Sequence, residues 1–569
     1  MRVAILQRPG EGLAAYVAEI LHTWGLVEYG AIDPAAAGGL DPRQTPVLLC
    51  PAGAGSAGAL AFARAGGTVV ACGPDEALAQ ACGLVMKGEL ETPVWLLPSA
   101  LPTPGLSGEL LPVVGQVRHL EGPAGARVLG YLCFPEHPNR EVPGVFEVAV
   151  GAGRVVLFAF DLPLAVLLLR QGDPARAEEQ PAGDCARPSH LAFDLGPRAE
   201  GWIPFADLLA RLLVEVVRRA LPGPVPLLWH LPEGAPGLVV YSGDEDQAEV
   251  AWNDAEFDAV RAGGGRMNLY LIPERTHSTA ADLDRYRQHH DLGPHPDLRP
   301  LDGRPVAERL AEFERQVRCF EQHFGVRART LRNHCTAWAG YLEIVEVMAR
   351  LGVRMEGNYF SGGFGRFRQP APYLPFGAAL PMRFCWPAGR LVEVYQQHTH
   401  LADDILFGAS GYSYKYTPAA FAAMLGRILD DMVGRLHTPY ATCIHPSNWV
   451  KFSGEQGAEV LAQAVRRGVP VWSFDQWSVF WDGRAASRFE CVQWQPESGR
   501  LQVEVNGLPR PPELRLMLPA RHAGASLMRV RIDGGQVECQ RARRYGEEVV
   551  FAPVGAGASV TIEAEYAAG

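Results

Sequence analysis

Four short segments in the middle of the chain carry side chains suited to hydrolytic chemistry. They contain Asp244 and Asp246, then His295, then Arg332 and His334, and finally His445. Each segment follows an apolar run, so we expect each to lie at the carboxyl end of a buried strand. In a β/α barrel, catalytic groups gather at that edge. Two carboxylates, three imidazoles and one guanidinium are residue types that metal-assisted hydrolysis uses.

The composition predicts a globular protein of several domains. A chain of 569 residues is too long for one core, and about three domains are expected. It is 48% hydrophobic, and its formal charge of −11 argues against a nucleic-acid or anionic-membrane partner. Its 11 cysteines include no Cys-x-x-Cys pair, which favours free thiols in a reducing compartment over disulfides or a cysteine-rich zinc site.

The apolar runs predict neither export nor membrane insertion. The run after Met1 is broken by Gln7, Arg8 and Pro9, which is too early for a secretory signal. The longest apolar run, near Leu162 to Leu169, is far shorter than the ~20 residues of a membrane helix. We therefore expect a soluble, cytoplasmic protein, and a homo-oligomer stays open.

Residues 1 to about 100 alternate short apolar strands, among them 3–6 and 47–50, with helical stretches, which predicts that residues 1–222 form a doubly wound α/β domain. Further strands of this domain are expected around 144–150 and 154–161. Prolines after the helix expected near 205–220 end this domain. Gly53, Gly55 and Gly58 match the spacing of a dinucleotide-binding turn. Because no acidic residue ends the following strand, we interpret the glycines as a tight turn.

The segment Gly66-Gly67-Thr68-Val69-Val70, after an alanine-rich helix, resembles class I glutamine-amidotransferase-like domains. The nucleophile of that family sits in a Gly-x-Cys-x-Gly elbow, a strained turn that exposes the thiol. Cys50 lacks both flanking glycines. The resemblance therefore implies a non-catalytic module in which Cys50 is a small buried hydrophobe.

Residues 223–487 repeat strand and helix signals, which predicts a distorted (β/α) barrel. The clearest helix is expected over 305–325, where apolar residues spaced by three and four form one stripe: Val306, Leu310, Phe313, Val317, Phe320 and Phe324. Residues 488–569 instead alternate apolar and polar positions between turns such as Asn506-Gly507. This last pattern predicts a small β-sandwich.

The four central segments resemble the motifs of the polysaccharide deacetylase family, carbohydrate esterase family 4. The resemblance covers the central domain and implies that Asp244 is the general base, with Arg332 holding it in place. It also implies that Asp246 and His295 bind a divalent metal ion, most simply zinc. His445, in Ile444-His445-Pro446, takes the place of the general acid.

The chain departs from the family at two motifs. Arg299 stands where a second histidine is usual, and a guanidinium cannot ligate a cation. We expect His334, two residues beyond Arg332 on the same strand end, to be the third ligand. The alternatives left open are His290, His398 and His400. In the fourth motif, Glu356 and Asn358 replace the aspartate that orients the acid.

These observations predict a metal-dependent deacetylase of N-acetylated sugars whose partner is a carbohydrate. The alternative is a catalytically inactive carbohydrate-binding or assembly protein that retains the barrel, and a glycosidase on the same barrel also stays open. A sugar-binding groove is expected from the loop 361–365 and four aromatic residues: Trp338, Tyr359, Phe360 and Trp449.

Overall fold

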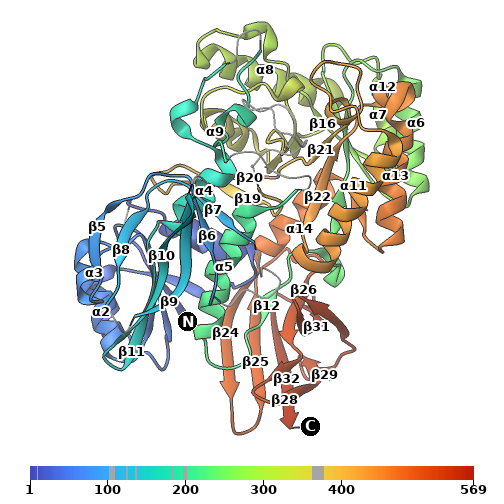
Figure 1. Ribbon diagram of the computed structural model, residues 1–569. Helices are drawn as coiled ribbons and strands as arrows, with labels where there is room; N and C mark the ends of the chain where they lie inside the picture. Colours follow the sequence, from blue (N-terminus) through green and yellow to red (C-terminus); the bar gives the residue numbers. More distant parts are fainter. Residues whose placement is uncertain are drawn as a thin grey trace.

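The chain forms three regions, as the computed structural model shows (Figure 1). The structure describes residues 1–8, 10–101, 109–123, 126–134, 137–180, 184–195, 202–361 and 377–568. Helices and sheets of both parallel and antiparallel type occur, so the predicted mixed α/β class is confirmed. The two predicted domain boundaries, after residues 222 and 487, stay predictions.

The amino-terminal region is built on one nine-stranded sheet with the order β2-β1-β3-β4-β11-β10-β9-β6-β7. The first five strands are parallel: β2 (Tyr29–Ile32), β1 (Val3–Leu6), β3 (Val47–Cys50), β4 (Thr68–Cys72) and β11 (Gly153–Phe158). The other four are antiparallel: β10 (His137–Val150), β9 (Arg127–Phe134), β6 (Val94–Leu97) and β7 (Leu111–Val113).

Helices cover both faces of this sheet, because side chains alternate along each strand. Val3 and Ile5 of β1 pack with helices α1 (Ala14–Thr23), α4 (Leu162–Gln171) and α5 (Phe205–Ala220). Ala4 and Leu6 pack on the other face with α2 (Ala57–Arg64) and α3 (Glu76–Ala81). The predicted helix over 205–220 is confirmed at both ends, whereas the amidotransferase likeness stays a prediction.

The central region contains three short sheets of mostly parallel strands. One has the order β14-β15-β16, another β17-β18-β20-β19 and the third β21-β22-β13-β23. Their bounds are β13 (Leu238–Val240), β14 (Ser242–Asp244), β15 (Asn268–Leu271), β16 (Asp291–Pro294), β17 (Thr330–Leu331), β18 (Met355–Glu356), β19 (Met382–Cys385), β20 (Leu391–Gln396), β21 (Leu401–Ala402), β22 (Pro439–Cys443) and β23 (Val471–Trp472).

Two of these sheets meet where β22 ends, since the backbone N–H of Ile444 donates to the carbonyl of Ser242 over 3.0 Å. The carboxyl ends of β14, β16, β17, β21 and β22 carry the candidate site residues. The strand pairings of the described residues form separate sheets, so a closed barrel stays a prediction.

Helices flank these sheets: α6 (Val250–Ala262), α7 (Ala280–Tyr286), α8 (Val306–Phe324), α9 (Glu343–Leu351), α11 (Pro418–Asp431), α13 (Gly454–Arg466) and α14 (Phe474–Ala486). The predicted apolar stripe of α8 is buried from Phe313 to Phe324, and its first two members are half-buried. The helix ends at Gly325, whose φ of 63° is left-handed and favours glycine.

The carboxyl-terminal region holds two antiparallel sheets. One is β24 (Arg488–Gln495), β25 (Arg500–Asn506), β32 (Ser559–Ala568), β28 (Ala525–Ile532) and β27 (Arg521–His522). The other is β12 (Leu227–Leu228), β26 (Arg515–Pro519), β31 (Glu547–Pro553) and β30 (Gln540–Arg544). β12 belongs to the segment that connects the first region to the central one, so this connecting segment forms part of a sheet of the last region.

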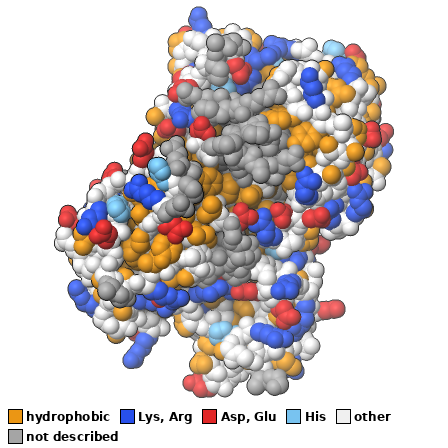
Figure 2. All heavy atoms as spheres, in the orientation of Figure 1, with side chains coloured by type: hydrophobic (Ala, Val, Ile, Leu, Met, Phe, Trp, Pro, Cys, Tyr) orange, Lys and Arg blue, Asp and Glu red, His pale blue; other side chains and the backbone are white. Residues whose placement is uncertain are grey.

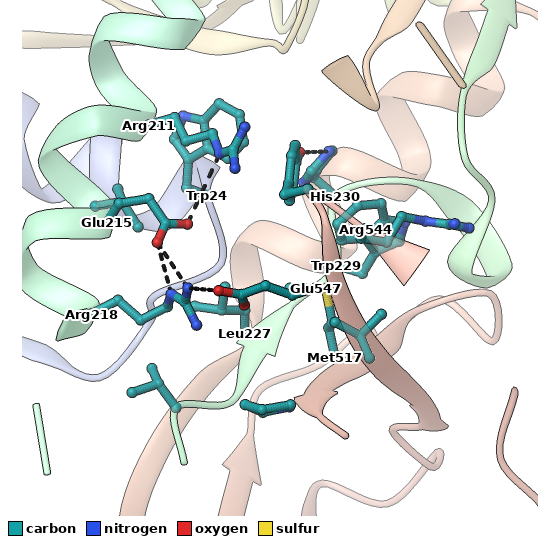
Figure 3. A pocket seen from close by; sticks show the side chains of 15 residues that line it. Trp24, Arg211, Glu215, Arg218, Leu227, Trp229, His230, Met517, Arg544 and Glu547 are labelled. Atoms are coloured by element: carbon teal, nitrogen blue, oxygen red, sulfur yellow. Dashed lines mark hydrogen bonds and ion pairs between the residues drawn. The ribbon is translucent and has the colours of Figure 1, made fainter. Parts of the chain in front are cut away.

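A polar junction joins the first and last regions (Figure 3). Arg218 of α5 pairs with Glu215 and with Glu547 of β31, each at 2.9 Å. The pocket beside them, lined by Trp24 and Trp229 among others, has a volume of ≈ 30 Å³. This volume suits about one water molecule and excludes a sugar. The junction is therefore a structural interface.

Arg484 near the end of α14 ties all three regions together. Its side chain is fully buried and donates to three backbone carbonyls, those of Thr23, Leu228 and Trp229, over 2.9–3.1 Å. Burial lowers the pKa of this guanidinium to about 9.

On the face shown in Figure 2, acidic and basic side chains are interspersed. None of the helices in the described ranges has the length and apolarity that crossing a bilayer requires.

Candidate active site

Arg332, directly after β17, is the buried centre of the candidate site. Its Nη1 donates to Asp244 Oδ1 over 2.8 Å, and its Nη2 donates to Ser242 Oγ and to Thr399 Oγ1. Its Nε donates to the carbonyl of Gly357 over 3.1 Å. Burial would raise the pKa of the Asp244 carboxyl, but the guanidinium lowers it below its ordinary value. Asp244 is therefore held as a carboxylate in a fixed orientation.

A left-handed turn, rather than the strand, brings Asp246 to the site. β14 ends at Asp244, and Asp246 and Gln247 have φ of 48° and 62°. The two carboxylates are therefore not brought together by alternation along one strand, although both reach His295. His295 Nε2 lies 3.2 Å from Asp246 Oδ1 and 3.8 Å from Asp244 Oδ2.

The tautomer of His295 follows from its other ring nitrogen. Its Nδ1 lies 2.7 Å from the carbonyl oxygen of Arg332, so this nitrogen carries the proton and donates it. Nε2 is then the ring nitrogen that faces Asp246. This is the arrangement by which a backbone carbonyl fixes a metal-binding histidine.

His334 also faces Asp246, from a 3₁₀ turn (His334–Thr336) beyond β17 and not from the strand itself. Its Nε2 lies 3.7 Å from Asp246 Oδ1, and its Nδ1 lies 3.2 Å from Asp297 Oδ1. Burial would lower the pKa of His334, but the Asp297 carboxylate raises it to about 10. Asp297 thus orients this imidazole, as a carboxylate does behind a metal-binding histidine.

The residues present fit a divalent cation at Asp246. His295 Nε2 and Asp246 Oδ1 are buried and make no further hydrogen bond among the described residues. Two imidazoles and a carboxylate form a sound zinc ligand set with room for water. Asp246 lies next to both imidazoles. Among the described residues, two other groups have ligand atoms that all lie within 4.8 Å of one another. They are Asp244, Cys443 and His445, and Asp403, Asp404 and His445.

His445, just beyond β22, is oriented by Asp403. Its Nδ1 lies 2.6 Å from Asp403 Oδ1, and its backbone N–H donates to Asp403 Oδ2 over 3.1 Å. Nε2 is left to face the site, 3.6 Å from Asp246 Oδ2. Burial would lower the pKa of His445, but Asp403 raises it well above its ordinary value. At neutral pH the imidazole is therefore a proton donor.

The other residues considered at the ligand positions lie elsewhere. Arg299 is half-exposed, with its Nε 3.7 Å from Asp297. His290 stacks on Phe257 with ring centroids 4.3 Å apart. His400 uses Nε2 on the carbonyl of Ala378 and Nδ1 on the backbone N–H of Ala441. His398 Nε2 lies 3.2 Å from the carbonyl oxygen of Arg170.

The fourth-motif residues support the backbone behind Arg332. Glu356 accepts from the N–H of Asn358 over 2.6 Å, and Asn358 Oδ1 accepts from the N–H of Asn333 over 2.7 Å. Burial raises the pKa of Glu356 to about 8. The carboxylate that orients His445 is thus Asp403, and neither of these two residues takes that place.

Most of the aromatic side chains expected to line a sugar-binding groove are buried. Trp338, Tyr359 and Phe360 are at most 5% exposed, so they pack in the core and cannot present a face to a sugar. Trp449 is half-buried. Residues 362–365 of the glycine-rich loop lie outside the described residues. Tyr412, 47% exposed, approaches the site with its hydroxyl 3.4 Å from Asp404 Oδ2.

Three residues of the site were missed in the sequence: Asp297, Asp403 and Cys443. Asp403 follows the apolar pair Leu401-Ala402 at a strand end, the same signal that singled out His445. Asp297 stands two residues after His295. Cys443 lies two residues before His445, and its thiol donates to Asp244 Oδ2 over 3.3 Å. Its position at a strand end could have identified Asp403, and their spacing from the neighbouring histidines could have identified Asp297 and Cys443.

Comparisons with known proteins give fold likenesses and no family. No family model matches the chain, and no curated protein matches it. Among solved structures, Agd3, a carbohydrate deacetylase, is 9% identical over 99% of each chain, with a TM-score of 0.37. A carbohydrate esterase family 4 pseudoenzyme from Bacillus anthracis is 9% identical over 43% of this chain and 66% of its own, with a TM-score of 0.28.

An exo-β-1,4-mannosidase from an Opitutaceae bacterium is 15% identical over 29% of this chain and 31% of its own, with a TM-score of 0.22. These three structures are described as a carbohydrate deacetylase, a pseudoenzyme of carbohydrate esterase family 4 and a mannosidase. At TM-scores this low, the choice among these activities rests on the site itself.

Proposed function

We propose that this protein hydrolyses the N-acetyl group of an N-acetylated sugar. The observation that carries the proposal is the pairing of a fixed carboxylate with a protonated imidazole around one cation site. Asp244 is held by Arg332, His445 is held by Asp403, and Asp246 with His295 and His334 forms the ligand set.

The side chains divide the reaction between a base and an acid. A divalent cation at Asp246, His295 and His334 would polarise the acetyl carbonyl and acidify water. Asp244 takes a proton from the attacking water, whose oxygen forms the new bond to the acetyl carbon. His445 gives its Nε2 proton to the leaving nitrogen as the C–N bond breaks. The products are acetate and a free amine.

The test of this proposal is acetate release from N-acetylglucosamine oligomers by the zinc-loaded protein. Asp244→Asn keeps the shape of the base but removes its ability to take a proton, so kcat is expected to fall by about 10²–10⁴-fold. Asp254→Asn on the outer face of α6 is the matched control, since the ion-pair partner of Asp254 among the described residues is Arg285. Undiminished acetate release by Asp244→Asn would remove this residue as the base.

A wild-type protein that binds zinc and sugar but releases no acetate would favour the alternative, a non-catalytic carbohydrate-binding protein. A free reducing sugar end in place of acetate would instead indicate a glycosidase. Both outcomes are read in the same reaction mixture, so one assay separates the three functions.

A further inference from the structure

Cys443 places a thiol inside the site, and the proposed reaction gives it no part. The side chain is 1% exposed, and Sγ lies 3.3 Å from Asp244 Oδ2. Cys443 ends β22, two residues before His445. A residue with this burial and a small apolar body could simply fill space, but its polar atom points at the base.

The ligand atoms around this thiol lie close enough together that they could hold a metal ion. Ligand atoms of Asp244, Cys443 and His445 all lie within 4.8 Å of one another. Ligands bound at roughly 2.0–2.3 Å to one zinc ion lie about 3–4 Å apart. We propose that Asp244, Cys443 and His445 form a second, inhibitory site for a soft divalent cation such as cadmium or excess zinc.

Asp244 and His445 each have a ligand atom besides the one that makes a fixed contact. Arg332 occupies Oδ1 of Asp244, which leaves Oδ2 toward the thiol. Asp403 occupies Nδ1 of His445, which leaves Nε2. Each residue thus offers one atom, and the set is carboxylate, thiolate and imidazole. Zinc accepts all three donors in proteins.

The surrounding charge favours a second cation. The carboxylates acting on His445 are those of Asp403, Asp246 and Asp404, and Arg332 is the guanidinium that faces Asp244 and Cys443. A cation at Asp246 offsets part of this negative charge, so the second ion should bind more weakly than the first. Inhibition is therefore expected only when metal exceeds one equivalent.

Binding of the second ion would remove the base and the acid together. The thiol loses its proton to solvent as the sulfur–metal bond forms, and His445 likewise gives up its Nε2 proton. Asp244 Oδ2 is then occupied and cannot accept a proton from water. Magnesium avoids thiolate ligands, so excess magnesium should leave the second site empty. This inhibitory effect rests on the proposed function, whereas the binding does not.

The binding is tested on the full chain loaded with one equivalent of zinc and titrated with cadmium in the absence of substrate. We expect a second bound ion by equilibrium dialysis and a thiolate-to-cadmium charge-transfer band in the ultraviolet. Cys443→Ser should weaken the second ion by at least about tenfold and abolish the band. Cys319→Ser on α8, where the thiol is half-buried, is the matched control and should change neither.

A second ion of equal affinity in Cys443→Ser would overturn the proposal. If that variant fails to fold, His445→Gln keeps the thiol and should lose the same second ion, and its retention would count equally against the proposal. Because no substrate is present, the outcome is independent of deacetylation. A wild type that never releases acetate would refute the proposed function and leave the metal result standing.

Discussion

Arg332 keeps Asp244 ionised and oriented, because the guanidinium donates hydrogen bonds to several partners at once. Two of them go to the strand of the base, one to Thr399 and one to the carbonyl of Gly357. The fork of a guanidinium reaches these partners at once, whereas a lysine ammonium offers one charged point. The orientation of Asp244 therefore depends on all the segments that Arg332 contacts.

The third metal ligand gives a prediction at this scale. His334→Ala should lose the metal and the activity together while the protein folds normally, because removing one of three ligands leaves two. His400→Ala is the control, since both of its ring nitrogens bind backbone groups. Elemental analysis measures the bound metal, and far-ultraviolet circular dichroism shows whether the variant is folded. Full metal occupancy in His334→Ala would refute the assignment.

The pH dependence should report the Asp403–His445 pair. Activity requires protonated His445, so kcat should fall as the pH rises through the raised pKa of this residue. Asp403→Asn removes the charge that raises this pKa, so the fall should begin at lower pH. At neutral pH we expect a loss of about 10–100-fold. A profile that keeps its position would show that Asp403 does not set the protonation of His445.

The elements determine how closely these residues approach. Gly243 lies in the middle of β14, and a Cβ there would come within 2.6 Å of the carbonyl oxygen of Ile444 and 3.1 Å of the Met267 side chain. The first contact is with backbone, so it cannot be relieved by a rotamer change. The strands that carry Asp244 and His445 therefore approach closely only because residue 243 has no side chain.

Gly243→Ala should push β14 away from the end of β22 and cost about 1–3 kcal/mol of stability. Activity should fall further than stability, because the base is the last residue of β14 and the acid lies two residues beyond β22. Gly434→Ala is the matched control, since nothing lies within 4 Å of its added Cβ. Thermal melting and acetate release measure the two effects. Unchanged activity would show that the strand spacing tolerates a methyl group.

Sequence patterns predicted elements well where one local signal dominates. The bounds of β1 and β3, and the ends of α5, agree with the apolar runs and the prolines that mark them. The turn at Asp246 and Gln247 could not be predicted, because neither residue is a glycine and their positive φ is imposed by tertiary contacts. Asp403 was missed for a related reason, since its partner lies 42 residues away.

The antiparallel half of the first sheet was also missed in part. Strands near 144–150 and 154–161 were expected, but β9, β6 and β7 were not. β6 and β7 have only four and three residues, which is too short for an alternating pattern to stand out in the sequence. The residue types of the candidate site were easier to recognise in the sequence than the architecture, because ligand chemistry restricts residue types more than packing does.

At the scale of the whole molecule, Arg484 is the residue whose loss should separate the regions. Arg484→Ala leaves three buried carbonyls without a donor and opens a cavity beside Trp481, so we expect a loss of about 3 kcal/mol or more. The melting temperature should fall, and limited proteolysis should cut between the regions. Arg466→Ala on the outer face of α13, exposed beside Glu459, is the control. Identical cleavage patterns would contradict this role.

The same arginine has a consequence for how the chain is made. Arg484 meets the carbonyl of Thr23 across 461 residues and that of Leu228 across 256. At typical translation speeds, the first of these groups waits roughly 20–90 s on the ribosome for its partner. During that interval the amino-terminal region exposes surface that the finished protein buries. A nascent chain of this protein therefore cannot complete the contact between Thr23 and Arg484 until its last third has emerged.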